Sequence, residues 1–173
     1  SAWLMWQQNE THRRHAAGNF RDYVKAISRD PAMLGYLNNQ QNRKGSPNEN
    51  YARELMELFT LGIGKYTEQD IREAARAFTG WHHDGEQFVF RRNQHDTGAK
   101  TFMRRTGPFG GDEIIDIILE QDAAADYIAS RIWNFFVAEQ IKPEYATSLG
   151  RVLRSGDYEL RRLLKTILTS KAF

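Results

Sequence analysis

Apolar side chains recur at a helical spacing along most of this chain, and this period constrains the fold more than any other feature. In residues 20–27, for example, aromatic and aliphatic side chains are three or four positions apart, which places them on one face of an α-helix. The same spacing returns in residues 160–168. In residues 81–90 apolar side chains alternate instead, as they do in a β-strand. The sequence therefore predicts a mainly α fold with one inserted β-hairpin.

Helix-start residues divide the helical pattern into about seven helices. Asp30 followed by Pro31 is a typical start, because the aspartate can accept from the first backbone N–H groups and proline fits the first turn. Thr67 and Asp70 resemble a capping box at the start of another helix. The chain length favours one domain over residues 1–173, built around one apolar core.

Two of the expected helices carry long apolar runs. In the helix expected at residues 49–61, Leu58 falls on the apolar side. In the helix expected at residues 122–137, Phe135 and Phe136 continue an apolar run. We expect these three side chains to be buried in the core.

Two irregular segments separate the helices. Residues 38–48 contain no apolar side chain apart from Pro47, so we expect a surface loop there. A loop of this length in a compact domain is often functional or mobile. Residues 91–111 are rich in glycine and arginine, and one further short strand is expected at residues 100–103.

Positive and negative charges nearly balance, with a formal net charge of +2. The total therefore predicts no dominating attraction to nucleic acid or to an anionic membrane. The charges are segregated, however, because residues 91–105 are mostly basic and the charged residues of 112–126 are all acidic. We expect these segments to form solvated faces that can pair with each other.

The chain has no cysteine, which excludes disulfides, thiolate nucleophiles and cysteine-ligated zinc. No stretch approaches the roughly 20 apolar residues of a membrane span. The first residues have no signal-peptide layout, and the chain opens at Ser1 directly into an amphipathic pattern. We therefore expect a fragment of a longer protein.

The first candidate site is the polar start of the helix expected at residues 49–61. Asn48 or Asn50 can cap this helix, and Arg53 can pair with glutamates four positions away on the exposed face. These structural roles explain most of the polar residues. The alternative is that Asn48, Asn50 and Arg53 bind a ligand.

Glu54 lies on the border of the apolar face of this helix. A carboxylate there is partly desolvated and needs a partner, which Arg72 or Arg76 of the next helix could supply. Glu54 is therefore a candidate catalytic carboxylate.

The second candidate site is the segment from His95 and Asp96 to Lys100. A histidine can bind a cation or carry a proton near neutral pH, a carboxylate can orient it, and a lysine can hold an anion. The structural alternative stays open, because Asp-x-Gly is typical of a turn and a loop histidine often serves as a hydrogen-bonding strut. His95 and Asp96 are the candidate catalytic residues, and Lys100 is a candidate ligand-binding residue.

A basic groove is a third possibility. Its candidate residues are Arg91, Arg92, Lys100, Arg104 and Arg105. Aromatic residues lie between them, so single-stranded nucleic acid could stack there, but the nearly neutral total favours a sulfated or phosphorylated ligand at least as much.

Other combinations point to no known chemistry. His12 and His15 are three positions apart and could meet one metal ion, yet the two arginines between them favour a solvated face. The chain has no His-Glu-x-x-His, Gly-x-Ser-x-Gly, P-loop or dinucleotide-binding motif. The identity of any metal or cofactor is therefore unknown.

The run NENYARELMELFTLGIGKYTEQDIREAARAFTGW at residues 48–81 resembles the signature of a bacterial family, the domain of unknown function 1800. HDTGAKTF at 95–102, GPFGGDEIIDIIL at 107–119 and IASRIWNFFV at 128–137 agree with it. The resemblance covers roughly residues 30–173.

The resemblance implies a setting rather than an activity. Members of this family resemble parts of longer, exported bacterial proteins and are often encoded beside a sulfatase-like or alkaline-phosphatase-like protein. A periplasmic or secreted location and such a partner are what the resemblance implies. Many members carry a histidine where this chain has Phe59, which weakens a metal role for that helix here.

Two classes of function follow. The first is a non-enzymatic module of an exported bacterial protein that binds a partner protein or an anionic polymer through the basic segment and the 38–48 loop. The alternative is a metal-dependent or acid-base hydrolase that uses His95, Asp96 and Glu54. The hydrolase requires these three side chains to converge in one pocket.

Overall fold

A computed structural model describes residues 1–137 and 140–173 of the chain. It confirms the mainly α prediction, with nine α-helices in the described residues where the sequence predicted about seven. They are α1 Ala2–His15, α2 Phe20–Ser28, α3 Pro31–Tyr36, α4 Asn50–Glu54, α5 Glu68–Ala77, α6 Gly111–Leu119, α7 Asp122–Phe136, α8 Pro143–Ser155 and α9 Leu160–Leu168. Three shorter helical segments are the 3₁₀-helices η1 Asn39–Gln41 and η3 Arg92–Gln94 and the π-helix η2 Leu55–Thr60. In the described part of the chain, no helix has the length and apolarity needed to cross a bilayer.

The predicted hairpin is present. Strand β1 Trp81–His83 pairs antiparallel with β2 Phe88–Phe90, with Trp81 opposite Phe90. A second hairpin, β3 Lys100–Phe102 with β4 Arg105–Gly107, contains the short strand expected at residues 100–103. Its second strand escaped prediction because the residues of β4 show no alternation of apolar and polar side chains.

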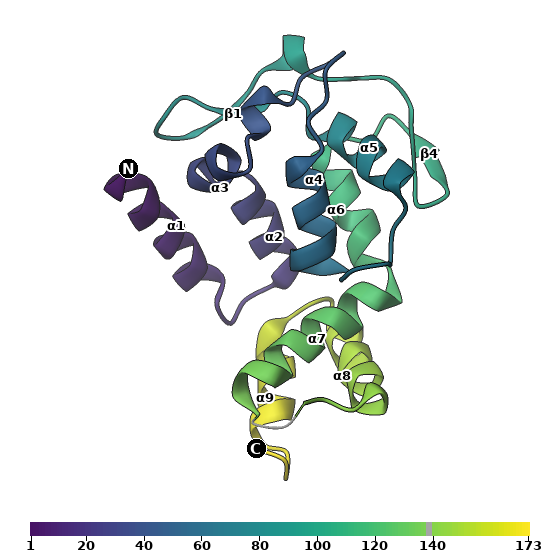
Figure 1. Cartoon of the computed structure of the whole chain (residues 1–173). Coiled ribbons are helices and arrows are strands. Elements are labelled where there is room, and N and C mark those ends of the chain that lie inside the picture. Colours follow the sequence, from purple (N-terminus) through teal and green to yellow (C-terminus); the bar gives the residue numbers. More distant parts are fainter. Residues whose placement is uncertain (138–139) are drawn as a thin grey trace.

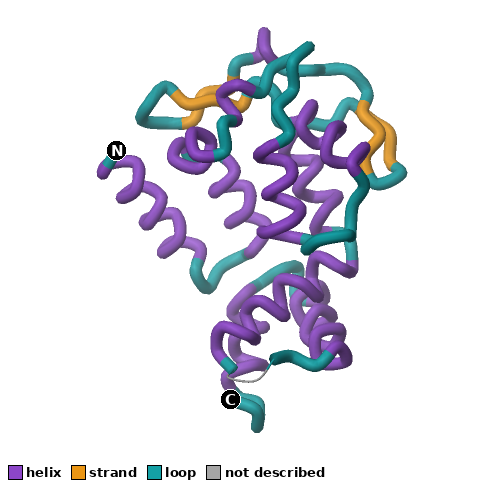
Figure 2. The backbone as a smooth tube through the Cα atoms, viewed as in Figure 1, coloured by secondary structure: helices purple, strands orange, loops and turns teal. Residues whose placement is uncertain are grey.

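The helices form two groups along the long direction of the molecule (Figure 1). Helices α2, α4, α5 and α6 pack in one group, with α1 on its outer side, and α7, α8 and α9 form the other. The two hairpins flank the first group on opposite sides, β1–β2 beside α3 and β3–β4 beside α5 (Figure 2).

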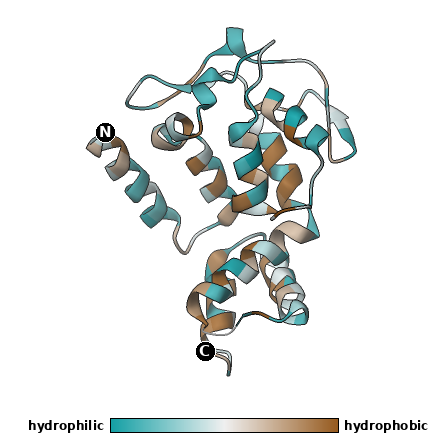
Figure 3. Cartoon of the chain, in the orientation of Figure 1, coloured by the Kyte–Doolittle hydropathy of each residue, from teal (hydrophilic) through white to brown (hydrophobic). Residues whose placement is uncertain are grey.

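Buried apolar side chains form one continuous cluster that runs through both groups. Hydrophobic residues gather on α4 and α6 at the centre and on α9 near the C-terminus (Figure 3). At the centre, the rings of Tyr51 and Phe78 meet edge to face at 4.9 Å, and the Tyr51 hydroxyl donates to Ser28. Burial of these apolar groups is the main driving force of the fold.

The two groups of helices are joined by backbone hydrogen bonds between two turns. The N–H of Phe20 donates to the carbonyl of Tyr158 at 2.8 Å, and the N–H of Leu160 donates to the carbonyl of Gly18 at 2.8 Å. The α1–α2 turn is thereby tied to the α8–α9 turn. This tie connects the start of α2 to the start of α9.

Candidate functional site

The loop that follows the first hairpin is held against the end of α5 by close backbone contacts. Gly80, which lies between α5 and β1, has a φ of +79°. A Cβ at this position would lie 2.6 Å from the carbonyl oxygen of Arg91. Only glycine fits such a conformation and such a close approach. The N–H of Gly80 donates to the backbone carbonyl of Asn42 at 3.1 Å, and the N–H of Arg91 donates to the carbonyl of Gly80 at 2.8 Å.

These contacts bring the 38–48 loop beside the segment that contains the predicted histidine site. The N–H of Lys44 donates to the carbonyl of Gln94 at 2.7 Å. The Asn42 side chain accepts from the N–H of Asn48 at 2.9 Å and donates to Ala75 at 2.8 Å. The two polar segments singled out in the sequence therefore lie at the same end of the molecule, away from the C-terminus (Figure 1).

Asp96 is engaged by an arginine of α5. Arg76 donates to both carboxylate oxygens of Asp96, at 2.8 and 3.2 Å, and the N–H of Gly98 donates to the same carboxylate at 2.9 Å. The guanidinium of Arg76 lowers the pKa of Asp96 to about 2. Asp96 is therefore ionised at neutral pH and occupied by a contact within the chain.

Arg76 also holds Glu73, which is buried. The Arg76 guanidinium donates to Glu73 at 3.1 Å and to the carbonyl of Ala99 at 3.1 Å. Glu73 accepts from the backbone N–H of Thr101 at 2.7 Å. Arg76 thus ties α5 to both the 95–101 loop and β3, a role that its sequence position alone did not reveal.

Lys100 is buried, with 1 % of its surface exposed. Its ammonium donates to the carbonyls of Asp96 at 2.6 Å and Gly98 at 2.9 Å. Burial lowers the pKa of Lys100, and the Asp96 carboxylate opposes this effect. The ammonium thus faces the inside of the loop, and its predicted part in ligand binding stays a prediction.

His95 lies half-buried on the other side of the same loop. Its Nδ1 is 2.9 Å from the carbonyl of Thr79, so this nitrogen carries the proton, because a carbonyl can only accept. The ring meets Phe90 edge-on at 5.2 Å. Thr79 also accepts from the N–H of Asp96 at 2.7 Å, so His95 and Asp96 share a neighbour but, in the described contacts, do not bond each other.

The polar start of α4 forms surface ion pairs, but the expected cap by Asn48 or Asn50 is wrong, because the N-cap residue is Glu49 and no side chain caps this helix. Asn48 accepts from the N–H of Asn50 at 3.0 Å. Arg53 donates to Glu49 at 3.2 Å and to Glu68 at 2.8 Å. A ligand-binding role for Asn48, Asn50 and Arg53 stays a prediction.

Glu54 is half-buried and makes no hydrogen bond or ion pair with another described residue. The expected partners have other contacts, since Arg76 binds Asp96 and Arg72 binds Gln69 at 2.9 Å. Within residues 1–137 and 140–173, no three His, Asp or Glu side chains are grouped closely enough to hold a metal ion. The described contacts do not join Glu54 to His95 or Asp96.

Four cations at this end are exposed and have no ion pair with any described residue. This basic surface consists of Arg43, Lys44, Arg91 and Arg92. Burial, the neighbouring His82 and the Arg91 cation lower the pKa of His83. The surface therefore carries a local positive charge that the nearly neutral total conceals.

The acidic segment at residues 112–126 pairs mainly with α2 and not with the basic segment. Asp112 binds Arg29 at 2.7 Å, and Asp116 binds Arg21 at 2.9 Å. Arg105 is the exception in the basic segment, because it pairs with Glu120. The expected pairing of the two segments is thus limited to the ion pair between Arg105 and Glu120. Arg91 and Arg92 form no ion pair with the acidic segment, which the structure describes in full.

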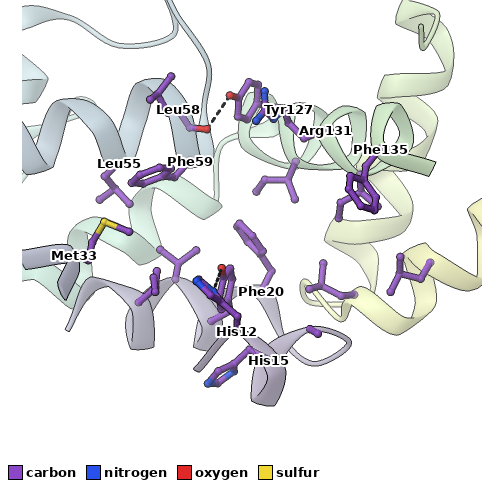
Figure 4. A pocket seen from close by; sticks show the side chains of 18 of the residues that line it. His12, His15, Phe20, Met33, Leu55, Leu58, Phe59, Tyr127, Arg131 and Phe135 are labelled. Carbon is purple, nitrogen blue, oxygen red and sulfur yellow. Dashed lines mark hydrogen bonds between the residues drawn. The ribbon is translucent and has the colours of Figure 1, made fainter. Parts of the chain in front are cut away.

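A large apolar cavity lies at a different place, between the two groups of helices. It is an open groove of about 790 Å³ with walls from α2, η2, α7 and α9 (Figure 4). Aliphatic and aromatic side chains supply most of the lining. These are Phe20, Val24, Ile27, Met33, Leu55, Leu58, Phe59, Ile128, Ile132, Phe135, Phe136, Leu160 and Leu164.

The sequence did not indicate this groove, because its lining residues were assigned to the core. Phe135 is 82 % exposed and Leu58 is 50 % exposed, so the expectation that they are buried is wrong. Leu58 turns outward because residues 55–60 form a π-helix, whose wider turn shifts the faces expected from α-helical spacing. Phe136, also expected in the core, is 40 % exposed at the groove.

Comparison with known proteins assigns the chain to a sequence family and gives no activity. The family model described as "Protein of unknown function (DUF1800)" matches residues 1–173. No curated protein and no solved structure matches the chain. The match extends the resemblance noted above to the first 30 or so residues.

Proposed function

The chain belongs to the DUF1800 family of proteins of unknown function, so its role must be inferred from its own surface, and we propose that it is a non-enzymatic module that binds an anionic polymer on the basic surface. The polymer is sulfated or phosphorylated. The proposal includes the setting that the sequence resemblance implies, an exported bacterial protein whose partner is sulfatase-like or alkaline-phosphatase-like. Such enzymes act on esters of the same two anions.

One observation supports the proposal above all others. The segments of Arg43–Lys44 and Arg91–Arg92 are distant in sequence but lie side by side, joined by the hydrogen bond from Lys44 to Gln94. All four side chains are exposed and have no ion pair in the described part of the chain. By contrast, the basic residues Arg21 and Lys25 of α2 and its C-cap residue Arg29 are paired with acids. Unpaired cations from two loops create a positive potential that attracts anions.

The exposure of this basic surface favours a polymer over a small anion. A single exposed ion pair contributes at most about 1 kcal/mol because water and salt screen it. Binding at such a surface therefore needs several contacts at once, which a chain of repeated sulfate or phosphate groups provides. Phe90, which is 41 % exposed and directly precedes Arg91, offers the polymer an apolar contact.

The hydrolase alternative receives less support from the geometry. Asp96 is held by Arg76, and Glu54 has no described contact with His95 or Asp96. An acid-base pair has to lie within hydrogen-bond reach of one substrate position. The binding function does not need such convergence.

The test is the binding of heparin, a sulfated polymer, at several salt concentrations. The double variant Arg91→Gln/Arg92→Gln should bind about thirtyfold more weakly, because two contacts of about 1 kcal/mol are lost. The slope of log Kd against log salt should also fall by roughly one for each cation removed.

The matched control is Arg161→Gln/Arg162→Gln. These two adjacent, exposed arginines lie on α9, at the other end of the molecule, and their loss changes the net charge by the same amount. The control should bind heparin like the wild type. An equal loss of binding in both variants would mean that net charge alone matters, and no heparin binding by the wild type would reject the proposal.

A further inference from the structure

The apolar groove suggests a second binding site that is independent of the basic surface. We propose that this groove binds a long-chain carboxylate, with the alkyl chain along the floor and the head group at Arg131. The groove and its named lining residues are drawn in Figure 4.

Most of the groove lining is apolar and can hold an alkyl chain. The hydroxyl of Tyr127 already donates to the carbonyl of Leu58 at 2.9 Å. The hydroxyl of Tyr23 lies 2.8 Å from Nδ1 of His12. With these hydroxyls engaged, the surface is aliphatic and aromatic apart from Arg131, His12 and His15. Such a surface binds by removing apolar area from water.

The ionisable groups along the groove fix the sign of the head group. Arg131 is exposed, lies 6.0 Å over the ring of Tyr127 and has no ion pair with another described residue. His12 and His15 line the opposite wall. Among residues 1–137 and 140–173, no aspartate or glutamate lines the groove. An anionic head group is therefore complementary to the rim, and a cationic one is not.

The size of the groove favours a thin alkyl chain over a helix of a partner protein. A helix is about 10 Å across with its side chains, so a volume of 790 Å³ holds only about two turns. Recognition of a helix in a groove uses anchors over a longer stretch, at positions i, i+3, i+4 and i+7. The volume lies within the range of roughly 300–1,000 Å³ that is usual for small-molecule sites.

The test is calorimetric titration of the whole chain with hexadecanoate, below the concentration at which this fatty acid forms micelles. We expect saturable binding of one molecule per chain. Decanoate should bind far more weakly, because each methylene removed from the groove costs about fourfold in affinity. The methyl ester of hexadecanoate, which lacks the negative charge, should bind up to about fivefold more weakly than hexadecanoate.

Two variants examine the head group and the chain separately. Arg131→Gln should weaken hexadecanoate up to about fivefold and leave the methyl ester unchanged. Leu58→Trp should abolish binding of both, because Leu58 is half-exposed at the groove and the larger ring fits into this space without disturbing the core. Arg151→Gln is the control, since Arg151 is exposed on α8 and does not line the groove.

Several outcomes would overturn the proposal. They are an absence of saturable binding, binding that Leu58→Trp leaves intact, and binding of hexadecanoate that does not distinguish Arg131→Gln from Arg151→Gln. Binding only to vesicles of anionic phospholipid would also overturn it, because the site would then be a membrane contact. Loss of heparin binding in these variants is not expected, so the two proposals can fail separately.

Discussion

The 95–101 loop and the apolar groove differ in how the chain uses the side chains that they contain. The loop holds the histidine, carboxylate and lysine that the sequence suggests as a site, and the fold engages each of them in internal contacts. The groove holds residues that the sequence suggests as core, and the fold leaves several of them uncovered. A binding site in this molecule is therefore better recognised by side chains that the fold leaves uncovered or unpaired than by the residue types in the sequence.

The largest effect on this comparison is expected from Arg76→Met. The substitution leaves the carboxylates of Glu73 and Asp96 without their shared cation in a largely buried position. Removing one member of such a network costs roughly 3 kcal/mol of the free energy of unfolding. Urea unfolding monitored by circular dichroism measures the change.

Arg72→Met is the matched control for this variant. Arg72 lies one turn earlier on α5, is exposed and donates only to Gln69. Its replacement should change the free energy of unfolding by less than about 0.5 kcal/mol. If the two variants lose the same stability, the 95–101 loop is not held by Arg76, and its charged residues are free to act as a site.

The second prediction concerns acid stability. The pKa of Asp96 is about 2 in the folded chain and about 3.9 in an unfolded one. Because the folded value is the lower one, the stabilisation by Asp96 is fully present above the unfolded pKa and is lost as the pH falls through the folded pKa. Between roughly pH 5 and pH 2 this loss amounts to about 2 kcal/mol.

The variant Asp96→Asn isolates this contribution from that of the other acids. The free energy of unfolding, measured by urea titration at each pH, should fall less steeply below pH 4 in the variant than in the wild type. Other carboxylates with lowered pKa values, such as Glu68 and Asp116, act equally in both proteins and cancel. Parallel curves for the two proteins would show that Arg76 does not hold Asp96 in solution.

The sequence predicts the helices well because local features specify them. The caps at Asp30 and Thr67 form as expected, with the side chains accepting from the N–H groups of Met33 and Asp70. The alternation around residues 81–90 does produce a hairpin. In each case the signal lies within a few residues of the element that it determines.

The candidate sites are harder to predict because their character depends on distant partners. Asp96 in an Asp-x-Gly sequence is equally compatible with a turn and with catalysis, and its partner Arg76 lies 20 residues earlier. The same holds for the groove, whose walls come from segments far apart in the sequence. The π-helix at residues 55–60 also changes which side chains are buried, and the apolar spacing does not predict its wider turn.

The smallest effect is expected from Phe135→Ala, at the open edge of the groove. Phe135 is 82 % exposed, and its one described ring contact is with Phe136, at 5.0 Å. An edge-to-face pair contributes about 0.5 kcal/mol, so the free energy of unfolding should change by about this amount. Phe102→Ala, at a residue with no exposed surface, should cost roughly 3 kcal/mol or more by the same measurement.

The contrast between these two phenylalanines tests what helical spacing can establish. Phe135 continues the apolar run of Ile128 and Ile132, so the sequence alone assigns it to the core. A loss of more than about 2 kcal/mol for Phe135→Ala would mean that the groove is closed in solution and that the sequence was right. A small loss means that the spacing identifies an apolar face, whereas coverage of that face depends on which other segments the fold brings to it.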